Sequence, residues 1–244
     1  MTYFDQREYD VRLEWGLSGL QALAPASDVL IIVDVLSFTT CVDIVVGRGG
    51  FVYPYRDSLD ALPAYAQARN ALFAAPGRRH EAAYSLSPAS LMAIPAGTRL
   101  VLPSPNGSTL SLSTANVPAM AGCLRNAQAV ATRAKQSGQR ISVIAAGERW
   151  KEKSGGVASG GLRVALEDLL GAGAIISYLD GRRSPEAETA VAVFRHAQAD
   201  LPDLLTRCGS GKELIGRGFA EDVQLAGQLN VSAAAPLLED GAYG

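Results

Sequence analysis

The 244-residue sequence lacks several features that would assign it to a familiar class of protein. Its three cysteines lie far apart, with no CxxC pair and no cysteine–histidine spacing, so a structural zinc site is excluded and buried free thiols are expected. Basic and acidic residues nearly balance, 22 against 24, which gives no basic surface for nucleic acid or anionic lipid. No run of 18 apolar residues occurs, and the charged start lacks the apolar core of a signal peptide. We therefore expect a cytoplasmic protein that binds neither nucleic acid nor membrane.

Common nucleotide-binding and nucleophile motifs are also missing. The sequence has no GxSxG elbow, no GxxxxGK[ST] loop and no GxGxxG fingerprint. The segment GSGKEL (209–214) resembles the end of a phosphate-binding loop but lacks the upstream strand and glycine. These absences exclude the most familiar nucleotide-dependent and serine-hydrolase chemistries.

The sequence does contain apolar strands that alternate with helical segments. Hydrophobic residues make up 48% of the chain, enough for a large core. The segment DVLIIVDVL (28–36) is almost wholly apolar and β-branched, as in a parallel strand covered on both faces. TRLVLPS (98–104) and RISVIAAG (140–147) are also predicted strands, each followed by a polar junction. The alternation predicts one domain over residues 1–244, a three-layer α/β/α sandwich with a mostly parallel or mixed sheet.

Three other segments give specific structural expectations. FVYPY (51–55) is a short strand that Pro54 should place at a sheet edge or make irregular. The polar, glycine-rich residues 148–161 are predicted to form a mobile loop. Residues 161–181 are predicted to form a long helix, with a bend at Gly171 or Gly173.

Polar side chains follow the predicted strands, where ligands gather in open α/β sheets. Asp34 ends the most apolar strand, and a carboxylate there is costly unless it is paired or bound to a metal. The alternative is that Asp34 caps the next helix or pairs with an arginine. Thr39 and Thr40 follow at that helix start, where they suit an anionic group.

The segment PSPNGSTLS (103–111) forms a second junction between strand and helix. Gly107 would let the backbone approach a ligand, and the first amides of a helix favour phosphate or sulfonate. Asn106, Ser108 and Thr109 add side-chain donors. The alternative is an ordinary Asn-Gly turn followed by a helix cap.

More polar and acidic residues follow the third strand. Gly147, Glu148 and Arg149 come directly after it, and Glu167 and Asp168 are adjacent on the next helix. Neighbouring helical residues point about 100° apart, so we expect metal or catalytic use of Glu167 more than of Asp168. The alternatives are a solvated acidic face for this pair, and pairing of Glu148 with Arg149.

In combination, these segments resemble the 2-phosphosulfolactate phosphatase (ComB-like) family, in order along nearly the whole chain. The family's D-V-L-R-A-(T/S)-T motif is matched by residues 34–40, and its T-N-G-T segment by 105–108. Its N-S-P segment is matched loosely by Leu86-Ser87-Pro88, and its E-D pair by Glu167-Asp168. The tail SGKELIGRGFAEDV (210–223) also resembles the family's closing segment.

The chain departs from the family pattern at two places. The family's arginine after D-V-L is Ser37 here, and its G-E-R segment is replaced by PGRRHEAAYS (76–85). Arg78, Arg79 and Arg149 are the candidates to supply a positive charge instead.

The resemblance implies a Mg²⁺-dependent phosphatase that converts 2-phospho-3-sulfolactate, or a related phosphorylated acid, to the hydroxy acid on a route to coenzyme M. It implies Asp34 and Glu167 as Mg²⁺ ligands, and Asp34, Glu148 and Asp168 as catalytic carboxylates. Glu148 or Asp168 would accept a proton from the attacking water, whereas a phosphoenzyme at Asp34 or Ser108 is an alternative. The residues expected to bind the anionic substrate are Thr39, Thr40, Ser87, Asn106, Gly107, Ser108, Thr109, Gly147 and Arg149.

Two other functions remain open at this point. One is a non-catalytic protein that binds an anion or metabolite on the same fold. The other is a different hydrolase or lyase acting on a related carboxylate. Apolar helical segments such as AVAVF (190–194) could pack in the core or form a homodimer.

Overall fold

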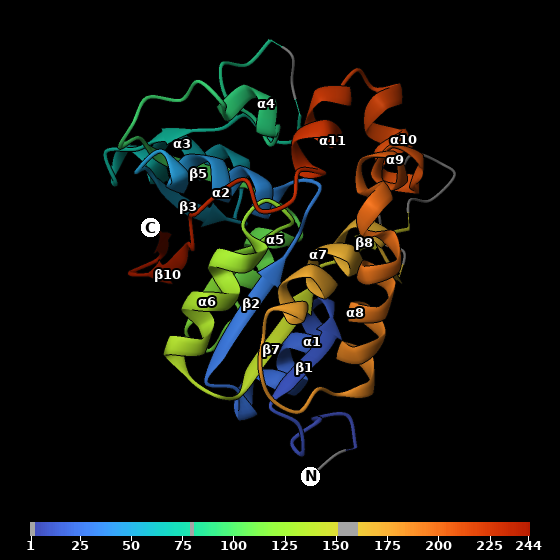
Figure 1. Ribbon diagram of the computed structural model, residues 1–244. Coiled ribbons are helices and arrows are strands. Elements are labelled where there is room, and N and C mark those ends of the chain that lie inside the picture. Colours follow the sequence, from blue (N-terminus) through green and yellow to red (C-terminus); the bar gives the residue numbers. More distant parts are fainter. Residues whose placement is uncertain (1–2, 79–80, 151–160) are drawn as a thin grey trace.

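A computed structural model describes residues 3–78, 81–150 and 161–244. Its centre is a mixed sheet of nine strands in the order β1-β7-β2-β6-β10-β11-β3-β5-β4 (Figure 1). The strands of this sheet are β1 (Val11–Trp15), β2 (Val29–Val33), β3 (Phe51–Tyr55), β4 (Leu72–Phe73), β5 (Arg99–Pro103), β6 (Ala119–Gly122), β7 (Ile141–Ala145), β10 (Leu237–Glu239) and β11 (Ala242–Tyr243). A separate antiparallel pair is formed by β8 (Glu148–Arg149) and β9 (Leu162–Arg163).

Helices cover both faces of the large sheet. The helices are α1 (Gly16–Leu23), α2 (Phe38–Gly47), α3 (Leu62–Gln67), α4 (Pro88–Leu91), α5 (Gly107–Ser111), α6 (Ala127–Ser137), α7 (Leu166–Ser177), α8 (Pro185–Ala197), α9 (Leu201–Arg207), α10 (Gly209–Gly216) and α11 (Ala220–Ala226). Ile31 of β2 packs with α6, α7 and α8, whereas its neighbour Ile32 packs with α1 and α5 on the opposite face. The predicted three-layer α/β/α sandwich is therefore confirmed. None of the described helices has the length and apolar character needed to cross a membrane.

The sheet consists of two parallel blocks joined by the hairpin of β10 and β11. Strands β1, β7, β2 and β6 are mutually parallel, as are β3, β5 and β4. β10 pairs antiparallel with β6, β11 with β10, and β3 with β11. These three antiparallel pairings reverse the direction of the second block relative to the first, which the alternation of strands and helices could not predict.

Of the two alternatives for β3, an edge position or an irregular strand, the edge position was wrong. β3 is internal, between β11 and β5. Pro54 is tolerated because β11 pairs with β3 only at Val52, so the missing N–H donor of Pro54 lies beyond that pairing.

The predicted helix over 161–181 was too long at both ends, since α7 runs from Leu166 to Ser177. Leu162 and Arg163 form β9, and α7 begins at Leu166. The helix continues through Gly171 and Gly173. These glycines allow close packing of the helix and do not interrupt it. A Cβ atom on Gly173 would lie 2.2 Å from the carbonyl oxygen of Ala190 in α8. Of the predicted loop 148–161, residues 151–160 lie outside the described residues.

Candidate active site

The carboxyl ends of three strands meet around two buried carboxylates. Asp34 follows β2, and its Oδ2 accepts a hydrogen bond of 2.8 Å from the amide of Gly107, which follows β5. Asp168 lies in the first turn of α7, and its two oxygens accept amides of Val35 and Gly147, each at 2.8 Å. Because Gly147 follows β7, these bonds connect the ends of β2, β5 and β7.

The carboxylates at this junction repel one another. Burial, and secondly the charge of Glu148, raise the pKa of Asp34 to about 7. Burial, followed by Glu167, raises the pKa of Glu148, and the same two causes raise that of Asp168. Glu148 is half-buried, and Asn106 Nδ2 donates to its Oε2 at 3.2 Å. The site therefore holds negative charge that a proton or a cation would stabilise.

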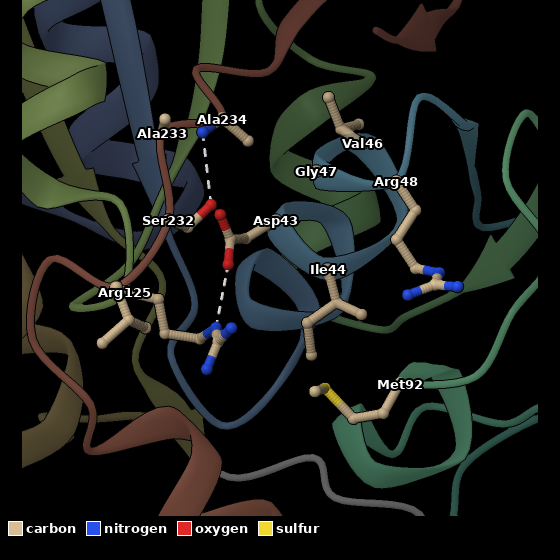
Figure 2. Close-up of a pocket in the computed structure, with 11 residues that line it drawn as sticks. Asp43, Ile44, Val46, Gly47, Arg48, Met92, Arg125, Ser232, Ala233 and Ala234 are labelled. Carbon is tan, nitrogen blue, oxygen red and sulfur yellow. Dashed lines mark hydrogen bonds and ion pairs between the residues drawn. The ribbon is translucent and has the colours of Figure 1, made fainter.

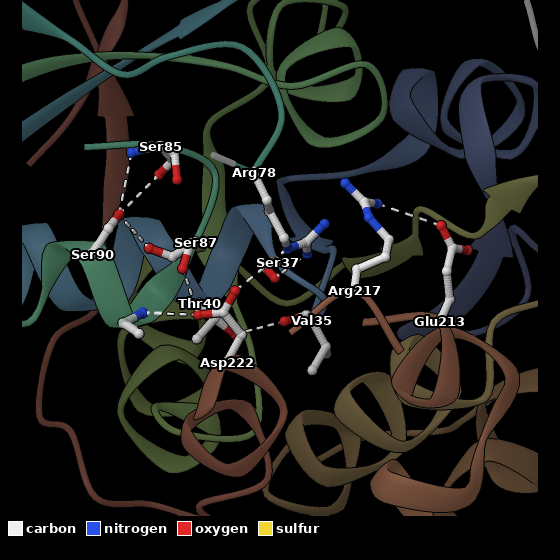
Figure 3. Close-up of polar contacts among 11 residues, drawn as sticks. Val35, Ser37, Thr40, Arg78, Ser85, Ser87, Ser90, Glu213, Arg217 and Asp222 are labelled. Atoms are coloured by element: carbon white, nitrogen blue, oxygen red, sulfur yellow. Dashed lines mark hydrogen bonds and ion pairs between the residues drawn. The ribbon is translucent and has the colours of Figure 1, made fainter. Parts of the chain in front are cut away.

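A cavity of about 200 Å³ opens beside Asp34, Asn106 and Glu148. Ser37 and Ser104 also line it. Further polar residues of the wall come from two other segments, namely the loop at residues 77–78 and residues 210–217, in and just after α10. The charged side chains on the wall are Asp34, Arg78, Glu148, Glu213 and Arg217. Figure 3 shows Arg78 and Arg217, and Nη1 of Arg217 lies 3.5 Å from Oε1 of Glu213.

Arg78 lies where the chain departs from the family pattern. Its Nη2 donates to Oγ of Ser37, and its Nε lies 3.4 Å from Oδ2 of Asp222 in α11 (Figure 3). Of the other two candidate arginines, Arg149 is exposed and lines neighbouring cavities, and Arg79 lies outside the described residues. Arg78 therefore brings a positive charge to Ser37.

Several hydroxyl groups predicted to bind substrate do not reach this cavity. They are buried, and each donates to a nearby group of the chain: Thr39 to the Asp34 carbonyl, Thr40 to the Val35 carbonyl, Ser87 to Asp222 and Ser108 to the Leu102 carbonyl. For Thr39, Thr40 and Ser108 the reason is local, because hydroxyl groups at the start of a helix readily bond to nearby backbone. Ser87 instead bonds to a side chain far away in the sequence. The buried hydroxyl of Ser108 also leaves Asp34 as the better placed of the two alternative nucleophiles.

The other predicted ligand contacts are only partly available. Thr109 Oγ1 donates to the Pro105 carbonyl and lies on the exposed side, next to other cavities. The amides of Gly107 and Gly147 are bound by the carboxylates of Asp34 and Asp168. Asn106 alone of the predicted anion-binding residues lines the cavity beside Asp34 and Glu148.

The donor set suits a cation that needs few protein ligands. Among the described residues, no three His, Cys, Asp or Glu side chains are placed to hold one metal ion together. Glu167 is buried and accepts a weak bond from Cys208 Sγ at 3.6 Å, and its charge acts on Glu148. Mg²⁺ binds through one or two carboxylates, water and substrate phosphate. With three carboxylates and two guanidinium groups on the cavity wall, a phosphoester would meet excess negative charge unless a cation is present.

A larger cavity of about 510 Å³ lies elsewhere and carries no comparable chemistry (Figure 2). It is lined by α2, by Met92 and by the segment at 231–234. Its buried charges form an ion pair, in which Arg125 Nε donates to Oδ2 of Asp43 at 2.9 Å. Arg125 also donates to the carbonyl of Leu225 at 3.3 Å. Arg125 therefore connects α2 with α11, which is a structural role.

The polar residues of α10 and α11 were missed by sequence reasoning. Ser210, Glu213 and Arg217 line the cavity, and Asp222 holds Arg78. The only signal was that residues 210–223 resemble the closing segment of the family. A helical pattern alone does not say which residues return to the site.

Residues 20–241 match the model of the family described as 2-phosphosulpholactate phosphatase. A 2-phosphosulfolactate phosphatase of Methanothermobacter thermautotrophicus is 32% identical over 145 residues, 59% of this chain and 58% of that protein. A probable 2-phosphosulfolactate phosphatase of Carboxydothermus hydrogenoformans is 31% identical over 143 residues, 57% and 55% of the two chains. A further one, of Thermosynechococcus vestitus, is 26% identical over 226 residues, 86% and 88% of the two chains.

The first two of these matches span little more than half the length of the relatives, whereas the family model spans most of this chain. The motifs that carried the resemblance fall within the matched residues. The chain belongs to the 2-phosphosulpholactate phosphatase family.

Proposed function

We propose that the protein is a Mg²⁺-dependent phosphatase that hydrolyses a small phosphorylated acid, with 2-phosphosulfolactate as the first candidate. The observation that carries this proposal is the cavity in which Asp34, Asn106 and Glu148 share a wall with two arginines. Family membership supports phosphate ester hydrolysis, and the carboxylates support a cation requirement. The volume of about 200 Å³ suits a small acid.

Asp34 and Glu167 are the proposed Mg²⁺ ligands. Asp34 lies on the cavity wall, and Glu167 acts on Glu148 by its charge. Mg²⁺ would offset the charge of the phosphoryl group and polarise one of its oxygens. Asp34 stays fixed throughout, because the Gly107 amide holds its Oδ2.

Glu148 is the proposed proton acceptor for the attacking water. Its raised pKa makes the carboxylate more basic than an exposed glutamate, and Asn106 orients it. When the water attacks phosphorus and the ester P–O bond breaks, Glu148 takes the proton of the water, which can pass to the leaving alkoxide. Asp168 is better suited to positioning than to proton transfer, since both of its oxygens bind backbone amides.

The test is phosphate release from 2-phosphosulfolactate by the purified chain, with Mg²⁺ and with EDTA. We expect Mg²⁺-dependent release, and a loss of at least about 100-fold in kcat for Asp34→Asn. The matched control is Asp180→Asn, because Asp180 is an exposed aspartate paired with Lys135. Equal rates for Asp34→Asn and wild type would contradict the proposal. Thermal stabilisation by the acid without phosphate release would instead favour the anion-binding alternative.

A further inference from the structure

Arg78 on the cavity wall belongs to a buried ion pair that the proposed hydrolysis does not use. The side chains of Arg78 and Asp222 are 10% and 1% exposed. Asp222 is held firmly, because its Oδ1 accepts the Ser87 hydroxyl at 2.6 Å and the Ala89 amide at 3.0 Å (Figure 3). Burying such a pair is costly, and an apolar pair of similar size would serve stability as well. The arrangement therefore points to a task for the guanidinium group.

The guanidinium group is only partly used by the protein. Nε faces Asp222 and Nη2 donates to Ser37. Among the described residues, Nη1 has no hydrogen-bond partner, and Arg78 lines the cavity. A guanidinium group offers five N–H donors in a fixed plane, which suits an oxyanion. Arg78 can thus receive an anion while Asp222 and Ser37 fix its orientation.

The cavity walls carry two chemically distinct sets of groups. Asp34 and Glu148 suit the cation and the phosphoryl group, as proposed above. Arg78, in the loop at residues 77–78, lines the same cavity, and its positive charge acts on Asp34. This lining suits a ligand that carries a second oxyanion beside its phosphoryl group.

We propose that Arg78 binds the second oxyanion of the substrate, a carboxylate or sulfonate, and that Asp222 is the positioning residue for Arg78. This inference rests on the proposed function for the identity of the phosphoryl end. The positive charge missing at Ser37 is then supplied by the facing loop, through the contact between Arg78 and Ser37.

The kinetic test compares two substrates in Arg78→Gln. With 2-phosphosulfolactate we expect KM to rise about 10- to 100-fold, as for the loss of a charge-assisted hydrogen bond. With p-nitrophenyl phosphate, which has no second anion, KM should change less than about threefold. The KM of Arg78→Lys for 2-phosphosulfolactate should lie between those of the wild type and Arg78→Gln, because the charge stays and the planar fork is lost. Arg48→Gln is the matched control, since Arg48 lines the other cavity.

Asp222→Asn tests the positioning role. It keeps Arg78 but removes the ionic partner, so we expect the KM for 2-phosphosulfolactate to rise by about 3- to 10-fold, with p-nitrophenyl phosphate unaffected. A merely structural role would change both substrates alike. The double variant Arg78→Gln with Asp222→Asn removes both charges and so avoids a lone buried charge. It should keep the fold and show the same substrate selectivity as Arg78→Gln.

A binding experiment separates this inference from the phosphatase proposal, because it needs no turnover. Calorimetry would measure the binding of 3-sulfolactate, lactate and 2-hydroxyethanesulfonate with Mg²⁺ present. Comparing the last two ligands distinguishes recognition of a carboxylate from recognition of a sulfonate. Binding of 3-sulfolactate that weakens at least about 10-fold in Arg78→Gln supports the inference even if no phosphate is released. Recovery of binding when Ser37→Arg is combined with Arg78→Ser supports it further. Unchanged affinity in folded Arg78→Gln, or equal losses for p-nitrophenyl phosphate and 2-phosphosulfolactate, would overturn it.

Discussion

Asp168 is the residue that holds two strand ends at the site. Its oxygens accept the buried amides of Val35 and Gly147. Asp168→Ala leaves both amides without an acceptor, each at a cost of about 1–3 kcal/mol, while relief of repulsion from Glu167 offsets part of that loss. We expect urea denaturation to show a free energy of unfolding lower by about 2 kcal/mol. Asp180→Ala is the exposed control, and equal stability of the two variants would contradict this role.

Asp34 should make the stability of the metal-free protein depend on pH. Its pKa rises from 3.8 to about 7 on folding, so between these values the folded state binds more protons than the unfolded state. The free energy of unfolding should therefore fall as pH rises from about 4 to 7, by up to about 1.4 kcal/mol per pH unit for one proton. Denaturation in EDTA at several pH values should show a shallower fall for Asp34→Asn. The same slope in both proteins would show that Asp34 keeps an ordinary pKa.

At the residue scale, the sequence could predict the groups whose place follows from a strand end. Asp34, Asn106 and Glu148 each follow a strand, and they do meet. It could not predict that the Thr39 hydroxyl bonds to nearby backbone instead of a ligand. Nor could it predict the pairing of Arg78 with a partner 144 positions later, because that contact depends on the packing of α11.

At the scale of elements, close packing of α7 on α8 depends on Gly173. A Cβ there would lie 2.2 Å from the Ala190 carbonyl oxygen, so Gly173→Ala should lower the free energy of unfolding by about 1–3 kcal/mol. At Gly216, at the end of α10, such a Cβ would meet no described atom within 4 Å apart from its chain neighbours and the backbone of its own helix. Gly216→Ala should therefore raise stability, by up to about 1 kcal/mol. Chemical denaturation of both variants checks the contrast, and a stabilising Gly173→Ala would contradict the packing.

Element existence was easier to predict than element boundaries. The apolar run of β2 predicts a strand directly, since both faces of that strand are buried. The start of α7 was missed because residues 162–163 pair with β8, a contact that helical periodicity does not reveal. The internal position of β3 was missed for a similar reason, because the effect of Pro54 on strand pairing depends on how far β11 extends along β3.

At the scale of the whole molecule, Tyr243 connects the two blocks of the sheet. It pairs with Val52 of β3, is fully buried, and shares a hydrogen bond of 2.7 Å with the Ser111 hydroxyl. Tyr243→Ala should lower the free energy of unfolding by about 3–5 kcal/mol because it leaves a large cavity. Tyr243→Phe removes only the hydroxyl and should cost about 1 kcal/mol. Urea denaturation tests both, with the fully exposed Tyr3→Ala as control, and a small effect of Tyr243→Ala would contradict this role.

The layered architecture was predictable because strands and helices alternate along the chain. The strand order was not, since a hairpin from residues 237–243 enters the middle of the sheet and reverses one block. This arrangement still brings the end of β5 to the end of β2, as the bond between Gly107 and Asp34 shows. The site therefore depends on the whole sheet and not on one βα unit.

A crystal structure of the protein with Mg²⁺ and inorganic phosphate would test directly whether one cavity binds both. We expect a Mg²⁺ ion about 2.0–2.1 Å from a carboxylate oxygen of Asp34, with the phosphate in the same cavity near Asn106 and Glu148. Mg²⁺ and phosphate bound on other surfaces, with Asp34 contacting neither, would contradict this expectation.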